Sequence, residues 1–231
     1  MKKFIFIAIL ALMILSVAIF CDDLTEPFSD VYDGATITFE DGLIWTAESI
    51  GDNNFQDDEA ECELSVEKFE GSRQLKIRVI GKNEKGDYKV PKIRFDVDKL
   101  IGTQNVSKIK SVSLDVTAAA NGTFTADNGD EILVPGNCMG EINANTGENC
   151  AVWTKLAGFN FAEWEKTSVK RHITGKILLD ESRYIDGETG CTLVLMRWSI
   201  PNSADIYIDN ITFFDDEGNP LPLVYNPAET D

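Results

Sequence analysis

The sequence predicts an all-β sandwich or jelly roll, and three observations lead to this prediction. About ten short segments rich in β-branched and aromatic residues alternate with turns rich in Gly, Asn and Asp. Several of these segments alternate polar and apolar residues, as strands with one buried face do. No segment has the length and apolar spacing of a long helix. A chain of 231 residues is long enough for one such domain with a full core.

Residues 1–21 have the composition of an export signal. A basic start precedes an uninterrupted, mostly apolar run from Phe4 to Phe20. Ser16 to Ala18 suits an ordinary signal peptidase, whereas Cys21 offers a lipidation site, although no small residue directly precedes it. Both outcomes stay open. A membrane-spanning anchor is disfavoured, because the run is short and no basic flank follows it.

The chain is strongly acidic, with a formal net charge of −18 at pH 7. Such a surface repels nucleic acid and anionic lipid, and it suits neutral partners and cations. Solubility alone accounts for much of this charge. Together with the export signal, the charge predicts a bacterial protein that is secreted or anchored at the cell envelope.

The cysteines that follow the signal are Cys62, Cys138, Cys150 and Cys191. An even number in an exported chain predicts two disulfides, for which three connectivities exist. We expect Cys138–Cys150 to close one loop and Cys62–Cys191 to join distant strands. A zinc site is disfavoured, because no Cys-x-x-Cys spacing occurs.

The folded domain is expected over residues 34–220, after an acidic linker or arm at residues 22–33. Its first strand, Gly34 to Gly42, ends in an Asp-Gly turn. Further strands with alternating polarity are predicted at Cys62–Glu67, Gln74–Ile80, Lys92–Val97 and Lys108–Ala118. Two shorter strands, near Phe124 and over residues 132–134, flank an Asn-Gly turn.

The segment from Gly136 to Asn149 is the longest irregular stretch of the predicted fold. It is rich in Gly and Asn and is bracketed by two cysteines, so it is a candidate binding loop. Strand character resumes over residues 151–157, and residues 159–165 are expected to form a turn of helix at most. Residues 168–179 predict another strand. Residues 191–198 are nearly all apolar and are therefore expected to lie in the centre of a sheet.

Ile206 to Phe214 is predicted to be a buried closing strand, because its residues are β-branched or aromatic almost throughout. Asp209 is the exception inside it. Burying a carboxylate alone costs several kcal/mol, so a bound cation or a nearby Lys or Arg must compensate. An acidic turn with Pro220 ends the strand, and the tail over residues 221–231 is not expected to pair far.

The two ends of the domain resemble jelly-roll carbohydrate-binding modules. Thr38-Phe-Glu-Asp-Gly42 with Trp45 resembles their opening strand, and Ile206-Tyr-Ile-Asp-Asn-Ile211 resembles their closing strand. Leu75 to Val79 and Val112 to Val116 are similar to their middle strands. The resemblance covers residues 36–220 and is strongest to the group of families four, eleven, twenty-two and thirty. It implies a β-sandwich jelly roll of the galactose-binding-like kind.

The resemblance also implies a structural calcium ion, Ca2+, shared by the first and last strands. Glu40 and Asp209 would supply carboxylate oxygens, and backbone carbonyls would complete the shell. Calcium takes six to eight oxygen ligands, so two carboxylates on paired strands suit it. The alternative is that Asp209 caps a turn or pairs with an arginine such as Arg197.

Glycan binding requires exposed aromatic planes with polar groups at their edges, because sugars combine flat C–H faces with hydroxyl groups. We predict Tyr88, Trp153 and Trp164 as stacking platforms and Arg197 as a hydrogen-bonding residue at the rim of a cleft. For each tryptophan, core packing is the competing role, because tryptophan is highly buried on average. Trp45 is expected in the core, and a salt bridge is the alternative for Arg197.

Catalysis is not expected. His172 is the single histidine, and there is no Gly-x-Ser-x-Gly elbow. Neither of the strand motifs typical of sandwich-fold glycanases, Glu-x-Asp-x-x-Glu and Glu-x-Asp-x-Glu, occurs. The sequence therefore predicts an exported, non-catalytic protein that recognises a neutral polysaccharide or oligosaccharide. A structural or adhesion protein of the envelope is the main alternative, and a small glycanase is another. Nucleic acid is not an expected partner, and the oligomeric state is left open.

Overall fold

The computed structural model describes residues 34–49, 62–79, 91–146, 152–176, 192–198 and 204–225. The predicted signal, its lipidation site Cys21, the linker, and residues Tyr88, Cys150 and Cys191 lie outside these ranges.

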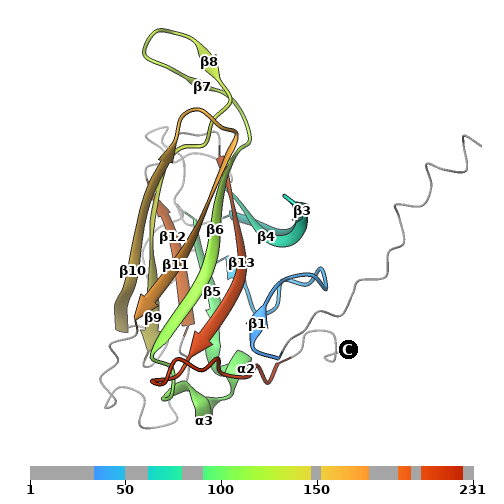
Figure 1. Cartoon of the computed structure of the whole chain (residues 1–231), viewed down its shortest axis with the longest axis vertical. Helices are drawn as coiled ribbons and strands as arrows, with labels where there is room; N and C mark the ends of the chain where they lie inside the picture. Colours follow the sequence, from blue (N-terminus) through green and yellow to red (C-terminus); the bar gives the residue numbers. More distant parts are fainter. Residues whose placement is uncertain are drawn as a thin grey trace, which may run out of the picture. The chain divides into compact units, whose positions relative to one another are not determined.

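Two antiparallel sheets make up the fold (Figure 1). Sheet A contains β1 (Thr36–Ile37), β3 (Cys62–Phe69), β4 (Ser72–Val79), β6 (Ser111–Ala120), β11 (Ser168–Lys176) and β13 (Ala204–Phe214). Its order is β11-β6-β13-β4-β3, with β1 also beside β13. Sheet B contains β2 (Glu48–Ser49), β5 (Lys92–Asp96), β9 (Gly136–Thr146), β10 (Val152–Glu163) and β12 (Thr192–Trp198), in the order β10-β9-β12-β5-β2.

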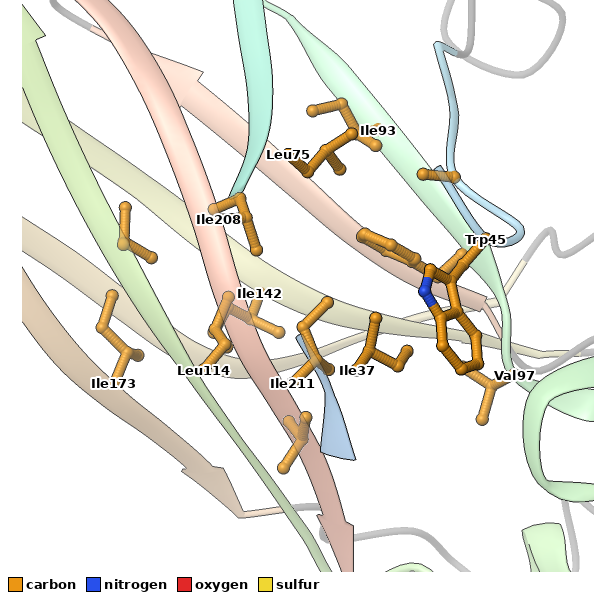
Figure 2. Close-up of a cluster of buried hydrophobic side chains, with 14 of the residues drawn as sticks. Ile37, Trp45, Leu75, Ile93, Val97, Leu114, Ile142, Ile173, Ile208 and Ile211 are labelled. Atoms are coloured by element: carbon orange, nitrogen blue, oxygen red, sulfur yellow. The ribbon is translucent and has the colours of Figure 1, made fainter. Parts of the chain in front are cut away.

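The core lies between the two sheets, because each strand turns alternate residues inward. Leu114 and Ile208 of sheet A and Ile93 and Ile142 of sheet B belong to one buried cluster (Figure 2). Each fully buried side chain of this size contributes roughly 1.5–3 kcal/mol to stability. The all-β sandwich that the sequence predicts is confirmed.

The first and last strands of the domain lie side by side, as the resemblance implies, and we call their contact the seam. Strand β1 pairs with β13, with Thr36 opposite Thr212 and Ile37 opposite Ile211. The side-chain hydroxyls of Thr36 and Thr212 lie 2.8 Å apart. The closing strand therefore lies inside sheet A, between β6 on one side and β4 and β1 on the other.

Short elements lie at the two ends of the strands (Figure 1). At one end lie α2 (Val97–Ile101) and α3 (Thr103–Val106), and the side chain of Asp96 caps the first of these by accepting from the backbone N–H of Lys99. At the other end, the hairpin of β7 (Phe124–Thr125) and β8 (Glu131–Ile132) turns at an Asn-Gly pair, as predicted. Neither helix in the described part of the chain could cross a membrane.

The prediction of an irregular loop over residues 136–149 is wrong for most of its length. Residues 136–146 form β9, which pairs with β10 on one side and β12 on the other. Cys138, Ile142 and Ala144 turn inward and are buried. The Asn residues between them hid this alternation. Strand β10 continues to Glu163, with a register shift between Lys155 and Ala157, over residues for which the sequence allows at most a turn of helix.

The folded domain extends past Pro220, beyond the boundary that the sequence predicts. Leu221 and Leu223 are buried in the core. The backbone N–H of Leu221 donates to the carbonyl of Phe213, and that of Leu223 donates to the carbonyl of Gly34. The two ends of the domain therefore meet.

Cys62 and Cys138 are both buried in the core. Their predicted disulfide partners, Cys191 and Cys150, lie outside the described residues, so both bridges stay predictions.

Candidate functional site

Strand β13 changes partner at Asp209 and Asn210. Up to Ile208 it pairs with β4, and from Ile211 it pairs with β1. Its register with β6 shifts between Asp209 and Thr212, which is a β-bulge. The carboxylate that the sequence marks as unusual therefore sits where the ladder is interrupted.

The turn between β3 and β4 folds over the outer face of sheet A, the face away from the core. The ring of Phe69 stacks on that of Tyr207 of β13, and Glu70 accepts a hydrogen bond from Ser168 of β11. Glycine at 71, with φ of 102°, permits the tight turn. Polar residues of this face, among them Asp209, are consequently buried.

Both oxygens of Asp209 accept hydrogen bonds. Oδ1 accepts from the backbone N–H of Asn210 at 2.9 Å, and Oδ2 accepts from the hydroxyl of Ser72 at 3.2 Å. Burial raises the pKa of Asp209 to about 6, and the nearby Glu40 carboxylate adds to this, while the two hydrogen bonds act in the opposite direction. Glu40 itself accepts from the backbone N–H of Arg73 at 3.1 Å.

These residues fit a calcium ion in part. Asp209, Glu40 and the Ser72 hydroxyl offer oxygen atoms, which are the ligands that Ca2+ prefers. In the described part of the chain, no Lys or Arg forms an ion pair with Asp209. No group of three or more His, Cys, Asp or Glu gathers there either, so backbone carbonyls, hydroxyls and water would have to complete the shell.

Asp115 lies opposite Asp209 in the register of β6 and β13. Its carboxylate accepts from Lys170 Nζ at 2.7 Å and from Asn210 Nδ2 at 2.9 Å, and His172 Nδ1 lies 2.9 Å from its other oxygen. Burial tends to raise the pKa of Asp115, but the hydrogen bonds from Lys170, Asn210 and His172 outweigh it and lower the pKa. Asp115 is therefore held as a carboxylate.

The outer face of sheet B carries a different feature, a buried amide. Asn143 of β9 is only 3% exposed, and it alternates with the core residues Ile142 and Ala144. Its Nδ2 atom has no hydrogen-bond partner among the described residues. An unsatisfied buried donor costs about 1–3 kcal/mol, so such a group calls for a specific explanation, and a ligand is one.

Ion pairs flank Asn143 on both sides. Lys155 of β10 is opposite Asn143 and donates to Glu141. Farther along the same row of the sheet, Arg94 Nε of β5 donates to Glu48 Oε1 of β2 at 2.7 Å. The amide thus lies between two ion pairs on this face of the sheet.

Two of the predicted sugar-binding residues, Trp153 and Trp164, do not lie close together, and Tyr88 lies outside the described residues. Trp153 and Arg197 are on strands of sheet B, opposite Asn145 and Gly140, and only their backbones are described. Trp164 follows β10 and is 43% exposed. Trp153 and Trp164 thus lie at opposite ends of β10, roughly 35 Å apart at the usual rise of a strand.

Trp45 has the role that the sequence predicts. It is buried in the core, and its ring meets that of Tyr225 edge-on with centroids 6.3 Å apart. The sequence does not predict a role for Asn143, because the composition of the segment that contains it is typical of a loop. The alternation of small or apolar residues with Asn, Met and Glu over residues 137–144 is the signal that could have revealed it.

No protein-family model matches this sequence, and no curated protein matches it. Among solved structures, a family 28 carbohydrate-binding module specific for non-crystalline cellulose superimposes with a TM-score of 0.51 at 13% identity, covering 77% of this chain and 91% of that one. The fold is that of a jelly-roll carbohydrate-binding module. The resemblance that the sequence indicates is thus confirmed.

Two further structures are similar. One is a family 22 xylan-binding domain from Paenibacillus barcinonensis, with a TM-score of 0.45, 13% identity, and coverage of 78% of this chain and 98% of that one. The other is a family 11 carbohydrate-binding module from Clostridium thermocellum in complex with a β-1,3-1,4-mixed-linked tetrasaccharide, with a TM-score of 0.43, 11% identity, and coverage of 77% of this chain and 92% of that one.

Proposed function

We propose that this chain is an exported, non-catalytic protein that binds a neutral polysaccharide or oligosaccharide on the outer face of sheet B. The observation that carries the proposal is the buried Nδ2 atom of Asn143, which lacks a partner among the described residues. Because Asn143 is only 3% exposed, a sugar hydroxyl or ring oxygen can accept from this amide only when binding displaces the side chains that cover it. Such a bond would remove the cost of the unsatisfied donor on ligand binding.

The charges of this face favour a neutral ligand. Lys155 is paired with Glu141, and Arg94 with Glu48, so these groups cancel in a protein of net charge −18. Paired side chains still have hydrogen-bonding capacity that hydroxyl groups can use. A charged ligand, in contrast, would have to compete with an existing ion pair.

Trp153 lies opposite Asn145 on the neighbouring strand β10, on the same side of sheet B as Asn143, so it is the proposed partner of Asn143. Arg197 lies opposite Gly140, in the row that turns toward the core, so it is proposed only as a residue at the rim, near the end of β12. Tyr88 of the segment before β5 is proposed to join them. Trp164 lies at the far end of β10 and would contact only a ligand that extends along that strand. We therefore assign Trp164 to a secondary contact with long polysaccharides.

The seam in sheet A is proposed to hold a structural Ca2+ with Glu40 and Asp209 as carboxylate ligands. When bound, the ion would neutralise a buried carboxylate that otherwise has a raised pKa. Ser72 would help to orient Asp209, since its hydroxyl already contacts Oδ2. Export, with Cys21 either lipidated or removed, completes the proposal.

Affinity electrophoresis against β-glucans, xyloglucan, xylan and mannans, at saturating calcium, tests the glycan proposal. We expect retardation by at least one of these polymers. Asn143→Asp keeps the size of the side chain and removes its donors, so we expect it to weaken binding about tenfold, the equivalent of one hydrogen bond of about 1.4 kcal/mol.

Asn137→Asp is the matched control, because Asn137 is an exposed asparagine at the other end of β9 and the charge change is the same. We expect this variant to bind as the wild type does. No retardation by any glycan would overturn the proposed function. Release of reducing sugar from a bound polymer would overturn its non-catalytic part.

A further inference from the structure

Asn210 adopts a backbone conformation that a side chain rarely accepts. Its φ is 53°, in the left-handed region, although it is not a glycine. Such a conformation is strained and persists where the surroundings enforce it. Asparagine tolerates it better than most residues do, yet here the bulge in β13 is also held from outside.

Two hydrogen bonds of Asn210 point in different directions. Its side-chain Nδ2 donates to Oδ2 of Asp115 on the neighbouring strand at 2.9 Å. Its backbone N–H donates to Oδ1 of Asp209 at 2.9 Å. The side chain thus fixes the residue to β6, while the backbone of the same residue fixes the carboxylate of Asp209.

Asp115 is a firm anchor for this arrangement. It is only 9% exposed, and Lys170 Nζ and His172 Nδ1 of β11 lie 2.7 Å and 2.9 Å from its oxygens. Asn210 supplies a third contact. The bulge is therefore held by β6 and β11, neither of which supplies a proposed calcium ligand.

The other side of Asp209 is fixed by the turn between β3 and β4. Ser72 donates to Oδ2 of Asp209, and the next residue, Arg73, donates its backbone N–H to Oε1 of Glu40. Both carboxylates of the seam are consequently oriented by adjacent residues of one turn. The contact through Asn210 comes from the other side of β13, where β6 lies.

We propose that Asn210 and Asp115 are positioning residues for the calcium site: Asp115 holds the left-handed bulge at Asn210, and the bulge orients the Asp209 carboxylate toward the ion. The proposal rests on the calcium site proposed above and extends it to residues that touch no metal. Outer partners of metal ligands typically change metal affinity by 10–100-fold when they are removed.

The test is calcium binding by isothermal titration calorimetry on the full chain after its export signal is processed, at a temperature where near-ultraviolet circular dichroism shows each calcium-free variant to be folded. We expect Asn210→Ala and Asp115→Asn to weaken the calcium Kd by at least about tenfold. Asn210→Gly accepts the left-handed backbone, so it should bind calcium more tightly than Asn210→Ala.

Lys170→Gln keeps the proposal testable if the stronger variants fail to fold. The Lys170 side chain is 44% exposed, so its replacement should be tolerated. It removes one contact of Asp115, and we expect it to weaken calcium binding about threefold, with the calcium-free melting temperature changed little. Thr174→Gln, at an exposed position on the same strand, is its control and should leave the Kd unchanged.

The outcomes separate the two levels of the proposal. The site stands if the wild type binds calcium and both Asp209→Asn and Glu40→Gln abolish binding. The positioning role is overturned if, in addition, the calcium Kd stays within twofold of the wild type in all three positioning variants: Asn210→Ala, Asp115→Asn and Lys170→Gln. If the wild type binds no calcium, the site fails and the positioning role fails with it. Equal affinities for Asn210→Gly and Asn210→Ala would overturn the role assigned to the left-handed backbone.

Discussion

The rings of Phe69 and Tyr207 lie stacked on the outer face of sheet A, with centroids 4.2 Å apart and planes inclined by 14°. Tyr207 is in the closing strand, and Phe69 ends β3 at the turn that covers Asp209. This contact therefore joins the cover of the seam to the strand that carries the buried carboxylate.

Replacing Phe69 tests how far that contact holds the turn in place. We expect Phe69→Ala to lower the free energy of unfolding by about 2 kcal/mol, through lost stacking and lost apolar burial. Urea unfolding measures the change. Lys68→Ala, at an exposed position on the same strand, is the control and should change stability by less than about 0.5 kcal/mol. Equal stabilities of the two variants would contradict the role of the stack.

Asp205 is expected to be among the most sensitive charged residues of sheet A. It is 3% exposed and lies 3.1 Å from Arg78, 3.4 Å from Lys76 and 2.7 Å from Asn121 Nδ2. Asp205→Ala leaves the buried Lys76 with Glu67 as its remaining anionic partner. Breaking a buried pair in this way costs on the order of 3–5 kcal/mol.

Arg78→Ala provides the contrast, because about half of the Arg78 side chain is exposed. An ion pair to such a group contributes about 1 kcal/mol or less. Guanidinium chloride unfolding of both variants should therefore separate them clearly. A loss on removal of Arg78 as large as the loss on removal of Asp205 would show that burial does not set the energy of this network.

Without calcium, Asp209 should weaken the fold at neutral pH. Its pKa is raised by burial from 3.8 to about 6 in the folded protein. A group with a raised folded pKa stabilises the fold fully below its unfolded pKa, and this contribution is lost as the pH rises through the folded pKa. The window is therefore between about pH 4 and pH 6, with stability falling as the pH rises.

Asp209→Asn removes this titration while keeping the shape of the side chain. In EDTA, we expect the variant to be more stable than the wild type near pH 7.5, by on the order of 2 to 3 kcal/mol, and equally stable only below the unfolded pKa, near pH 3.5. Carboxylates with lowered pKa values, such as Asp115, titrate in both proteins and cancel in the comparison. Calcium should raise the melting temperature of the wild type alone. A pH-independent difference would contradict this prediction.

Trp153 and Trp164 should contribute independently to glycan binding. They lie at opposite ends of a 12-residue strand, so no short ligand reaches both. We expect Trp153→Ala to weaken binding of a short oligosaccharide and Trp164→Ala to leave it unchanged. On a long polysaccharide the two losses in binding free energy should add. Titration calorimetry with both ligands measures this, and equal losses on the short ligand would place both residues in one site.

The sandwich and its seam could be predicted from sequence because their residues follow a period of two. Val112, Leu114 and Val116 point inward from β6, and the pattern is as clear in β13. Strand β9 escaped prediction because its outward residues are Asn, Met and Glu and its inward ones include Gly140. The composition of β9 is typical of a loop, so neither this central strand nor the burial of Asn143 could be predicted.

The surroundings of Asp209 were predictable only in outline. The sequence shows a carboxylate within an otherwise apolar strand, and the resemblance pairs this carboxylate with Glu40. The role of Asp115 is not, because it depends on a one-residue shift in the pairing of β6 and β13 and on a turn that folds over an outward face. Alternation places Asp115 on the outward side, where a charge is ordinary; only the tertiary fold shows that it is buried.

Strand β13 pairs with β1, β4 and β6, so it fills the gap between segments that are made much earlier in synthesis. Before residues 204–214 are available, β4 and β6 have no common neighbour in sheet A. Contacts of such long sequence separation form slowly. Sheet A therefore cannot close until residues 204–214 have been synthesised, however early its other strands are made.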